Sequence, residues 1–168
     1  MVNSESNGKV ALITGANKGL GLEMGRQLGQ HGLTTLIAAR NLQAAEAAAT
    51  TLQKEGLKAE AIALDVNNSN QIQSAVQEIG DRFGKLDVLI NNAGVMLDGD
   101  WSISNASSVP IDTIRQTFNT NFFALVELTQ KLLPLILKSP NGRIVNMASI
   151  EGSLTLHADP NSPIYDSK

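Results

Sequence analysis

One stretch near the N-terminus decides the fold of this chain, Thr14-Gly15-Ala16-Asn17-Lys18-Gly19-Leu20-Gly21. It follows an apolar run at residues 10–13 that predicts a buried β-strand. It leads into Leu20, Met24 and Leu28, which share one face of a helix. A strand, a glycine-rich turn and a helix present backbone N–H groups and the positive end of a helix dipole to a phosphate.

The glycines of this turn have separate predicted roles. Gly15 allows the tight turn, Gly19 removes a side chain where a pyrophosphate approaches the backbone, and Gly21 lets the helix pack close to the strand. The spacing is G-x-x-x-G-x-G, whereas many dinucleotide folds carry G-x-G-x-x-G. Glycine-rich turns also occur without a ligand, so the turn alone leaves that alternative open.

Length and composition predict one globular domain over residues 1–168. The chain is 42% hydrophobic and 17% charged, with a net charge of −3 and no Lys/Arg run, which argues against nucleic acid or an anionic membrane as a partner. It has no cysteine and its two histidines, His31 and His157, lie far apart, so no metal site is expected. No apolar run approaches the roughly 18 residues of a membrane span, and the N-terminus lacks a signal peptide pattern. We therefore expect a cytoplasmic protein.

Strand and helix patterns alternate along the rest of the chain. Apolar runs predict strands at 10–13, 34–39, 59–64, 86–90 and 143–147, with helices between them. This order predicts an α/β fold, a doubly wound Rossmann-type parallel sheet with strand order 3-2-1-4-5 and helices on both faces. Ligand is then expected over the carboxyl ends of the strands, at residues 15–21, Asp65 and 91–94.

The fourth helix and the C-terminal segment carry weaker patterns. Pro110 suits the first turn of the fourth helix, and Ile114, Phe118, Phe122 and Leu125 form a stripe predicted to lie in the core. Residues 153–168 hold two prolines and no periodicity, so they are expected to form a loop.

Several motifs occur in order at the predicted strand ends and helices. They are the glycine turn, Asp65, Asn91-Asn92-Ala93-Gly94, Asn121 in the fourth helix and Ser149 after the fifth strand. With these motifs, residues from 9 to about 149 resemble the short-chain dehydrogenase/reductase family, in particular its carbonyl-reductase-like members. The resemblance implies an oxidoreductase that transfers a hydride between a nicotinamide cofactor and a small-molecule carbonyl or alcohol substrate. A homo-oligomer of the full-length protein is compatible with it.

The resemblance also implies roles for individual residues. Ser149 would hydrogen-bond the substrate oxygen, although a loop serine that caps backbone is the alternative, and Asn121 would support a water relay to a catalytic lysine. The cofactor would be held by residues of the turn and of the strand ends: Gly15, Asn17, Lys18, Gly19, Leu20, Gly21, Arg40, Asp65, Val66, Asn92, Ala93 and Gly94.

The end of the second strand predicts which cofactor is used. NAD-selective sites place an Asp or Glu there for the ribose 2′-hydroxyl, whereas this chain has Arg40. The Arg40 guanidinium can hold a 2′-phosphate, and Lys18 can add a second positive charge. We therefore expect NADP rather than NAD, with two solvated surface cations as the alternative.

The family's catalytic pair, Tyr-x-x-x-Lys, has no match here. Tyr165 and Lys168 stand three residues apart instead of four, in a Pro-rich context that disfavours a running helix. We expect Tyr165 in a loop and the pair beyond residue 168, in a C-terminally truncated chain that lacks the last strands and is inactive by itself. A non-catalytic NADP-binding sensor or structural protein of the same fold is the alternative, and a nucleotide-independent scaffold is hard to reconcile with the glycine turn.

Overall fold

The structure is a computed structural model that describes residues 8–99 and 107–165. Five parallel strands form one sheet in the order β3-β2-β1-β4-β5, which confirms the predicted doubly wound arrangement. The strands are β1 (Val10–Thr14), β2 (Thr34–Ala39), β3 (Ala59–Ala63), β4 (Val88–Asn91) and β5 (Arg143–Asn146). The chain passes from β3 at one edge to β4 beside β1, so the strand order changes direction between β1 and β4, where such sheets bind ligands.

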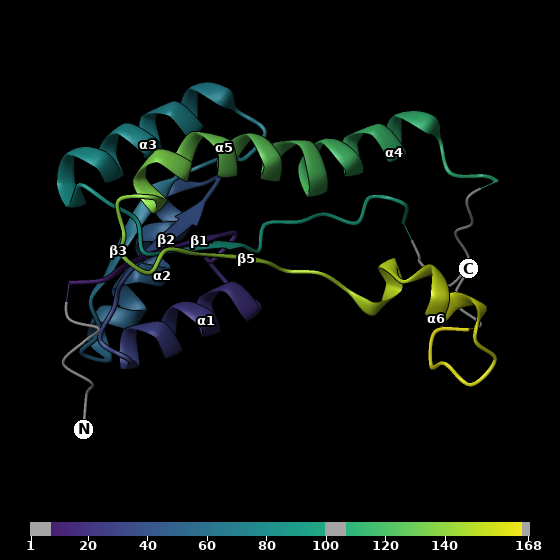
Figure 1. Cartoon of the computed structure of the whole chain (residues 1–168), viewed down its shortest axis with the longest axis horizontal. Helices are drawn as coiled ribbons and strands as arrows, with labels where there is room; N and C mark the ends of the chain where they lie inside the picture. The colour runs from purple at the N-terminus through teal and green to yellow at the C-terminus, as the bar shows by residue number, and fades with distance from the viewer. Residues whose placement is uncertain (1–7, 100–106, 166–168) are drawn as a thin grey trace.

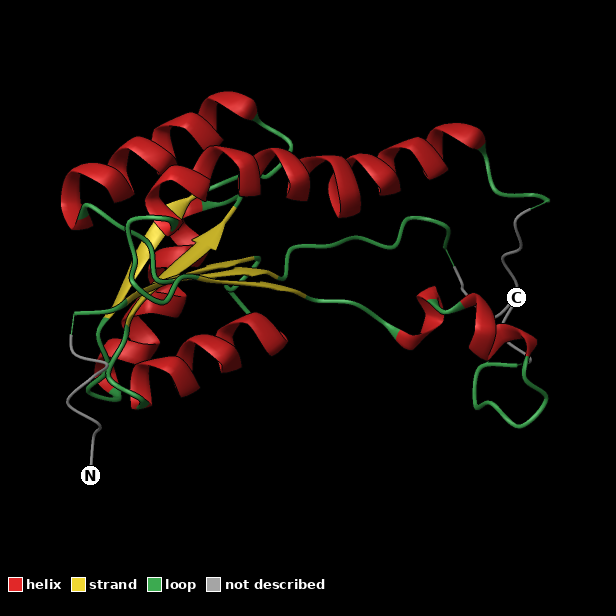
Figure 2. Ribbon diagram, viewed as in Figure 1, coloured by secondary structure: helices red, strands yellow, loops and turns green. Residues whose placement is uncertain are grey.

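Helices cover both faces of this sheet (Figures 1 and 2). On one face, α1 (Gly19–Gln30) and α2 (Leu42–Lys54) pack against β1 and β2 around Ile13 and Ile37. On the other face, α3 (Ser69–Phe83) and α5 (Ala124–Ile136) pack around Leu12 and Leu89. Both faces of β1 are thereby buried, which explains why this strand reads as a continuous apolar run.

Side-chain caps explain where the helices begin. The Asn41 side chain accepts a hydrogen bond from the Ala44 N–H and so begins α2. Asn68 does the same for the N–H groups of Asn70 and Gln71 at the start of α3. Gly84 ends α3 with a φ of +70°, a conformation that glycine adopts at low cost.

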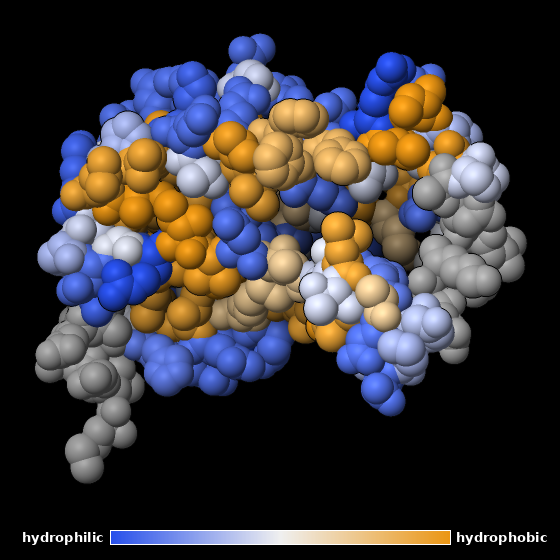
Figure 3. All heavy atoms as spheres, turned by 45° about the vertical axis from the view of Figure 1, so that its right-hand side comes forward, coloured by the Kyte–Doolittle hydropathy of each residue, from blue (hydrophilic) through white to orange (hydrophobic). Residues whose placement is uncertain are grey.

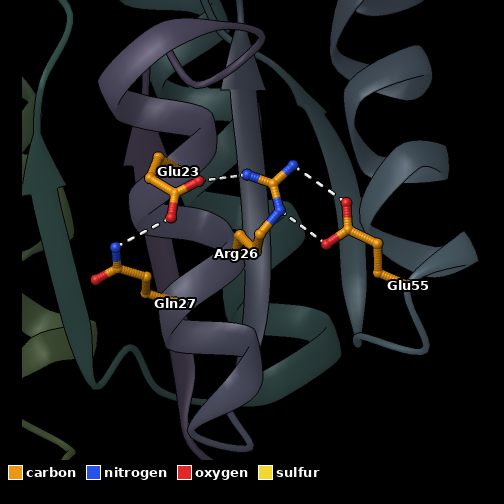
Figure 4. Close-up of polar contacts among 4 residues, drawn as sticks. All are labelled: Glu23, Arg26, Gln27 and Glu55. Atoms are coloured by element: carbon orange, nitrogen blue, oxygen red, sulfur yellow. Dashed lines mark hydrogen bonds and ion pairs between the residues drawn. The ribbon is translucent and has the colours of Figure 1, made fainter.

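A guanidinium clamp joins α1 to the end of α2 on the surface (Figure 4). Arg26 donates from Nε and Nη2 to the Glu55 carboxylate at 2.7 and 3.1 Å, and from Nη1 to Glu23 on its own helix. Gln27 donates to the other Glu23 oxygen at 3.0 Å. These carboxylates, Glu55 first, raise the pKa of Arg26 above its usual value, so the clamp stays charged at any ordinary pH.

The predicted fourth helix is divided. It consists of α4 (Ile111–Phe118), a π-helical turn (Asn119–Phe123) and α5. The prediction that Phe118 and Phe122 lie in the core is wrong, since both are more than half exposed. The reason is visible in Figure 1, where α4 extends beyond the sheet, so this end of the helical stripe meets no strand.

The loop expected over residues 153–168 is also corrected. A 3-10 turn (Ile150–Gly152) and a one-turn helix, α6 (Leu154–Ala158), follow β5, and the Ser153 hydroxyl caps α6 by accepting from the Leu156 N–H. A five-residue helix is too short to show a 3.6-residue period, so the sequence pattern could not reveal it. Among the described residues, no helix has both the length and the apolar composition that crossing a membrane requires.

Candidate functional site

A cavity of about 430 Å³ lies at the carboxyl ends of the strands. Every residue predicted to hold a cofactor lines it except Asp65. The structure thus gathers the glycine turn, Arg40 after β2, Val66 after β3 and the Asn92–Gly94 segment after β4 around one space. Contact with a cofactor itself stays a prediction for these residues.

The glycine turn leaves room on its cavity side. Gly15 and Gly19 have φ angles of +62° and +57°, which residues with a Cβ rarely adopt. A Cβ on Gly19 would meet no atom within 4 Å, so this position opens onto free space. A Cβ on Gly21 would lie 2.6 Å from Asn92 Nδ2 and 2.8 Å from the Gly15 oxygen. Gly21 therefore makes room for the turn and for Asn92, rather than only for close packing of helix against strand.

Thr14 and Asn92 join the glycine turn to the end of β4. The Thr14 hydroxyl accepts hydrogen bonds from the N–H groups of Asn92 and Ala93 at 3.0 and 2.9 Å. In return, the Asn92 amide donates to the Thr14 and Gly15 carbonyls at 2.8 and 3.2 Å. Thr14 is buried, and its place at the end of an apolar strand was the only sequence signal for this role. The cavity floor is thus fixed by polar contacts between residues far apart in the chain.

The rim of the cavity is positive. Lys18 and Arg40 are exposed and line the same space. Lys18 is the N-cap residue of α1, its side chain makes no capping hydrogen bond, and the first turn of α1 carries no acidic residue. The helix dipole and the first-turn N–H groups therefore add to the potential of the two side chains. This combination attracts an anionic group such as a phosphate.

Asp65 is not among the residues that line the cavity. Its carboxylate accepts from the Asn67 N–H at 3.0 Å, and its own N–H donates to Gln71 Oε1 at 2.7 Å. These bonds fold the segment after β3 into a tight turn that presents Leu64, Val66 and Asn67 to the cavity instead.

Sequence reasoning missed five lining residues: Ala39, Leu64, Asn67, Val95 and Thr120. Four of them stand within three residues of a predicted strand end or of the Asn-Asn-Ala-Gly motif, so their neighbourhood was a usable signal. Thr120 directly precedes the predicted Asn121, but it lies inside a helix pattern that gave no sign of the π-helical turn.

Asn121 grips the backbone next to the cavity. Its Oδ1 accepts from the Val95 N–H and its Nδ2 donates to the Val95 carbonyl, both at 2.8 Å. Val95 lines the cavity, so Asn121 shapes the wall through this residue. The predicted water relay stays a prediction.

Ser149 and Tyr165 lie on the segment that leaves β5. The Ser149 hydroxyl accepts from the Glu151 N–H at 3.2 Å and caps the 3-10 turn, which is the structural role named above as its alternative. Tyr165 is exposed in a turn, where its N–H donates to the Ser162 carbonyl at 3.2 Å. Lys168 lies outside the described residues.

Asn91 connects β5 to this arrangement. Its amide donates one proton to Asn146 Oδ1 on β5 at 2.8 Å and the other to Thr129 Oγ1 on α5 at 3.1 Å. Its carbonyl accepts from the Met147 N–H at 3.0 Å. Both donor protons of the buried amide are satisfied, and the strand that leads to Ser149 is held in place.

Comparisons with known proteins agree with this architecture. The family model for short chain dehydrogenases matches residues 9–165. Similar curated proteins include a ketoacyl reductase from Nostoc sp., 40% identical over 145 residues, with 86% of this chain and 49% of that protein covered. Another is the NADPH carbonyl reductase 1 of Sus scrofa, 36% identical over 153 residues, with 90% and 50% covered.

Solved structures give the same result. A metagenomic short-chain oxidoreductase in complex with NADP superposes with a TM-score of 0.79 at 27% identity, covering 89% of this chain and 66% of that one. The chain spans about half the length of the curated relatives named here.

Proposed function

This chain belongs to the short chain dehydrogenase family, and we propose that its cavity binds NADP(H) for hydride transfer to or from a small carbonyl or alcohol compound. One observation carries the proposal: the glycine turn and the start of α1 open onto a cavity whose rim holds Lys18 and Arg40. The relatives named for NADP and NADPH support the same cofactor.

The residues present fit a dinucleotide. The open position at Gly19 accommodates a pyrophosphate against the backbone, and the N-terminus of α1 compensates its charge. The strand order then assigns the two ends of the ligand. The side of β2 and β3, with Arg40, Leu64 and Val66, takes the adenine half, and the side of β4, with Ala93 and Gly94, takes the nicotinamide half.

Arg40 is the proposed determinant of NADP over NAD. It stands directly after β2, where an acidic side chain would bind the ribose 2′-hydroxyl of NAD. The Arg40 guanidinium is positively charged, so it attracts a 2′-phosphate and forms charge-assisted hydrogen bonds with it. Lys18, in the glycine turn, lines the same cavity.

Two side chains, Asn121 and Ser149, are proposed to act where the substrate binds. NADP(H), when bound, supplies or accepts the hydride. Asn121 holds Val95, and through it the wall next to Gly94. The Ser149 hydroxyl accepts from the Glu151 N–H and keeps its own proton to donate to a carbonyl oxygen. Ser149 is thus the proposed substrate-oxygen donor.

A second candidate function is binding of NADP without catalysis. It is favoured by the chain's single tyrosine, Tyr165, which lies in a turn and stands three residues before Lys168. These 168 residues therefore contain no Tyr-x-x-x-Lys pair. We propose that they form the cofactor-binding part and do not by themselves reduce a carbonyl compound.

Calorimetric titration with NADPH and NADH tests the cofactor proposal. The unaltered chain is expected to bind NADPH about 10-fold or more tightly than NADH, given the strength of charge-assisted hydrogen bonds. Arg40→Asp removes this preference, whereas Arg115→Asp, a change at an exposed arginine of α4 away from the cavity, keeps it. Equal affinities for the two nucleotides in the unaltered chain would refute the assignment of Arg40, and absence of binding would refute the proposed function.

A further inference from the structure

Two polar side chains meet across the adenine side of the cavity. Asn67 Nδ2 donates to Thr120 Oγ1 at 2.9 Å, although the residues stand 53 positions apart in the chain. Both line the cavity. The bond joins the segment after β3 to the π-helical turn between α4 and α5, two elements that the strands themselves do not connect.

The Asn67 side of this bond is held firmly. The Asn67 N–H is bound by the Asp65 carboxylate, and the next residue, Asn68, caps α3 with its side chain. The Asp65 N–H is in turn bound by Gln71 on the first turn of α3. The segment after β3 is therefore fixed at both ends, and Asn67 presents its amide from a rigid base.

The Thr120 side is placed by the π-helical turn. Thr120 and Asn121 are consecutive, yet they reach different walls of the cavity: Thr120 bonds Asn67 after β3, and Asn121 bonds Val95 after β4. The turn at Asn119–Phe123 places Thr120 in the cavity lining and Asn121 against Val95, which itself lines the cavity. A single element thus connects the proposed adenine and nicotinamide sides.

We propose that Thr120 is a positioning residue for the adenine half of the nucleotide, acting through Asn67, an inference that rests on the proposed function. In the free protein the Asn67–Thr120 bond is solvent-exposed and water competes for both groups. A nucleotide that fills the cavity displaces this water and strengthens the bond. The bond therefore contributes to affinity for the ligand more than to stability of the free chain.

Calorimetry with two probes tests this, NADPH and adenosine 2′,5′-bisphosphate, which lacks the nicotinamide half. Thr120→Val keeps the shape of the side chain and removes the hydroxyl. This variant is expected to bind both probes about 3- to 10-fold more weakly, by the same factor for each, which is the effect of one hydrogen bond. Thr120→Ser restores the affinity. Thr117→Val is the matched control, because the Thr117 hydroxyl binds the carbonyl of Thr113 in its own helix at 2.9 Å.

Asn67→Ala removes the donor of the same hydrogen bond and completes a double-mutant cycle with Thr120→Val. The double variant is expected to bind no more weakly than either single variant, because each change removes the same hydrogen bond. If Thr120→Val does not fold, Asn67→Ala compared with the unaltered chain tests the same hydrogen bond, with Thr117→Val as the control. Additive losses, or equal affinities in Thr120→Val and Thr117→Val, overturn the inference while NADPH binding to the unaltered chain still stands. Absence of NADPH binding to the unaltered chain overturns the proposed function instead.

Discussion

At the scale of single residues, Gly21 in the glycine turn has no room for a larger side chain. A Cβ on Gly21 would come within 2.8 Å of backbone at Ala16 and Gly15, and within 2.6 Å of Asn92. Backbone cannot move aside as a flexible side chain can. Gly80, also inside a helix, has only ordinary contacts of 3.6 and 3.9 Å to Leu135 at the same point.

Alanine at these two glycines is predicted to act in opposite directions. Gly21→Ala should destabilise the fold by about 1–3 kcal/mol, the cost of overpacking, and weaken NADPH binding with it. Gly80→Ala should stabilise it by about 0.4–1 kcal/mol, because the unfolded chain loses conformational freedom. Urea denaturation of both variants measures the difference, and a loss of equal size in both would contradict the packing argument.

Asp87 is a buried carboxylate directly before β4, at the amino ends of the strands and so at the opposite end of the sheet from the cavity. It accepts hydrogen bonds from the Ser139 hydroxyl at 2.6 Å, the Val10 N–H at 2.8 Å and the Lys85 ammonium at 2.9 Å. Burial raises the pKa of Asp87, but the bonds from Ser139, Lys85 and Val10 together outweigh burial and hold the pKa below its ordinary value. The charged form thus holds together the start of β1, the start of β4 and the segment before β5.

Asp87→Asn is predicted to lower the free energy of unfolding by about 1–3 kcal/mol at neutral pH, because a buried acceptor becomes a donor. A carboxyl whose pKa is lower when folded stabilises fully above its unfolded pKa, near 3.9, and loses this contribution as the pH falls toward the folded pKa. The difference in the free energy of unfolding between the Asp87→Asn variant and the unaltered chain should therefore become smaller below about pH 4. The exposed Asp81→Asn is the control. A gap that widens in acid would contradict the assignment.

At the scale of elements, α1 and α2 are joined in two ways. Buried side chains below them form one hydrophobic cluster with the sheet, and the Arg26–Glu55 clamp connects them above. The clamp is exposed to solvent, so salt screens it. Burial therefore holds the layer together, and the clamp adds a surface link between α1 and the end of α2.

Arg26→Gln is predicted to cost a small amount of stability at low salt and nothing measurable in molar salt. Thermal unfolding at the two salt concentrations checks this. Arg115→Gln, which breaks an exposed ion pair within α4 instead of between two helices, is the control. A loss that persists at high salt would mean that the Arg26 stem contributes through packing rather than through charge.

At the scale of the whole molecule, the cavity floor is held by partly buried polar contacts, whereas much apolar side-chain surface elsewhere is exposed. Figure 3 shows apolar residues spread across the face that it presents. In the chain as a whole, the exposed large apolar side chains include Phe118, Phe122, Phe123, Val145 and Leu154, on α4, the π-helical turn, β5 and α6. The strand β5 has only one neighbour in the sheet and is exposed along its length. Under the proposed function, the nucleotide binds over the buried strands β3 to β4, and substrate chemistry falls on the side of the exposed β5.

The 168-residue chain is accordingly predicted to bind NADPH without oxidising it in the presence of a small aldehyde. A positioned general acid supplies about 10²–10⁴-fold in rate, and Tyr165 lies in a turn at the wrong spacing from Lys168 to act as one. NADPH absorbance over time, with and without aldehyde, is the measurement. Turnover that disappears in Tyr165→Phe would show that Tyr165 is a catalytic acid after all.

The sequence by itself determined the strand order and most of the cavity, because both depend on local patterns. An apolar run followed by glycines, and Asn-Asn-Ala-Gly after another run, place their residues at strand ends wherever the strands lie in a parallel sheet. The same holds for Arg40 and Lys18.

The tertiary structure decided what depends on distant partners. Asp65 does not line the cavity, and its backbone N–H and one carboxylate oxygen bond Gln71 and Asn67 instead. Thr120 reached the cavity because a π-helical turn directs it to Asn67, and Phe118 and Phe122 stayed exposed because α4 extends past the sheet. A periodic pattern states which side chains share a face of a helix. It does not state what that face meets, since burial is set by elements far away in the chain.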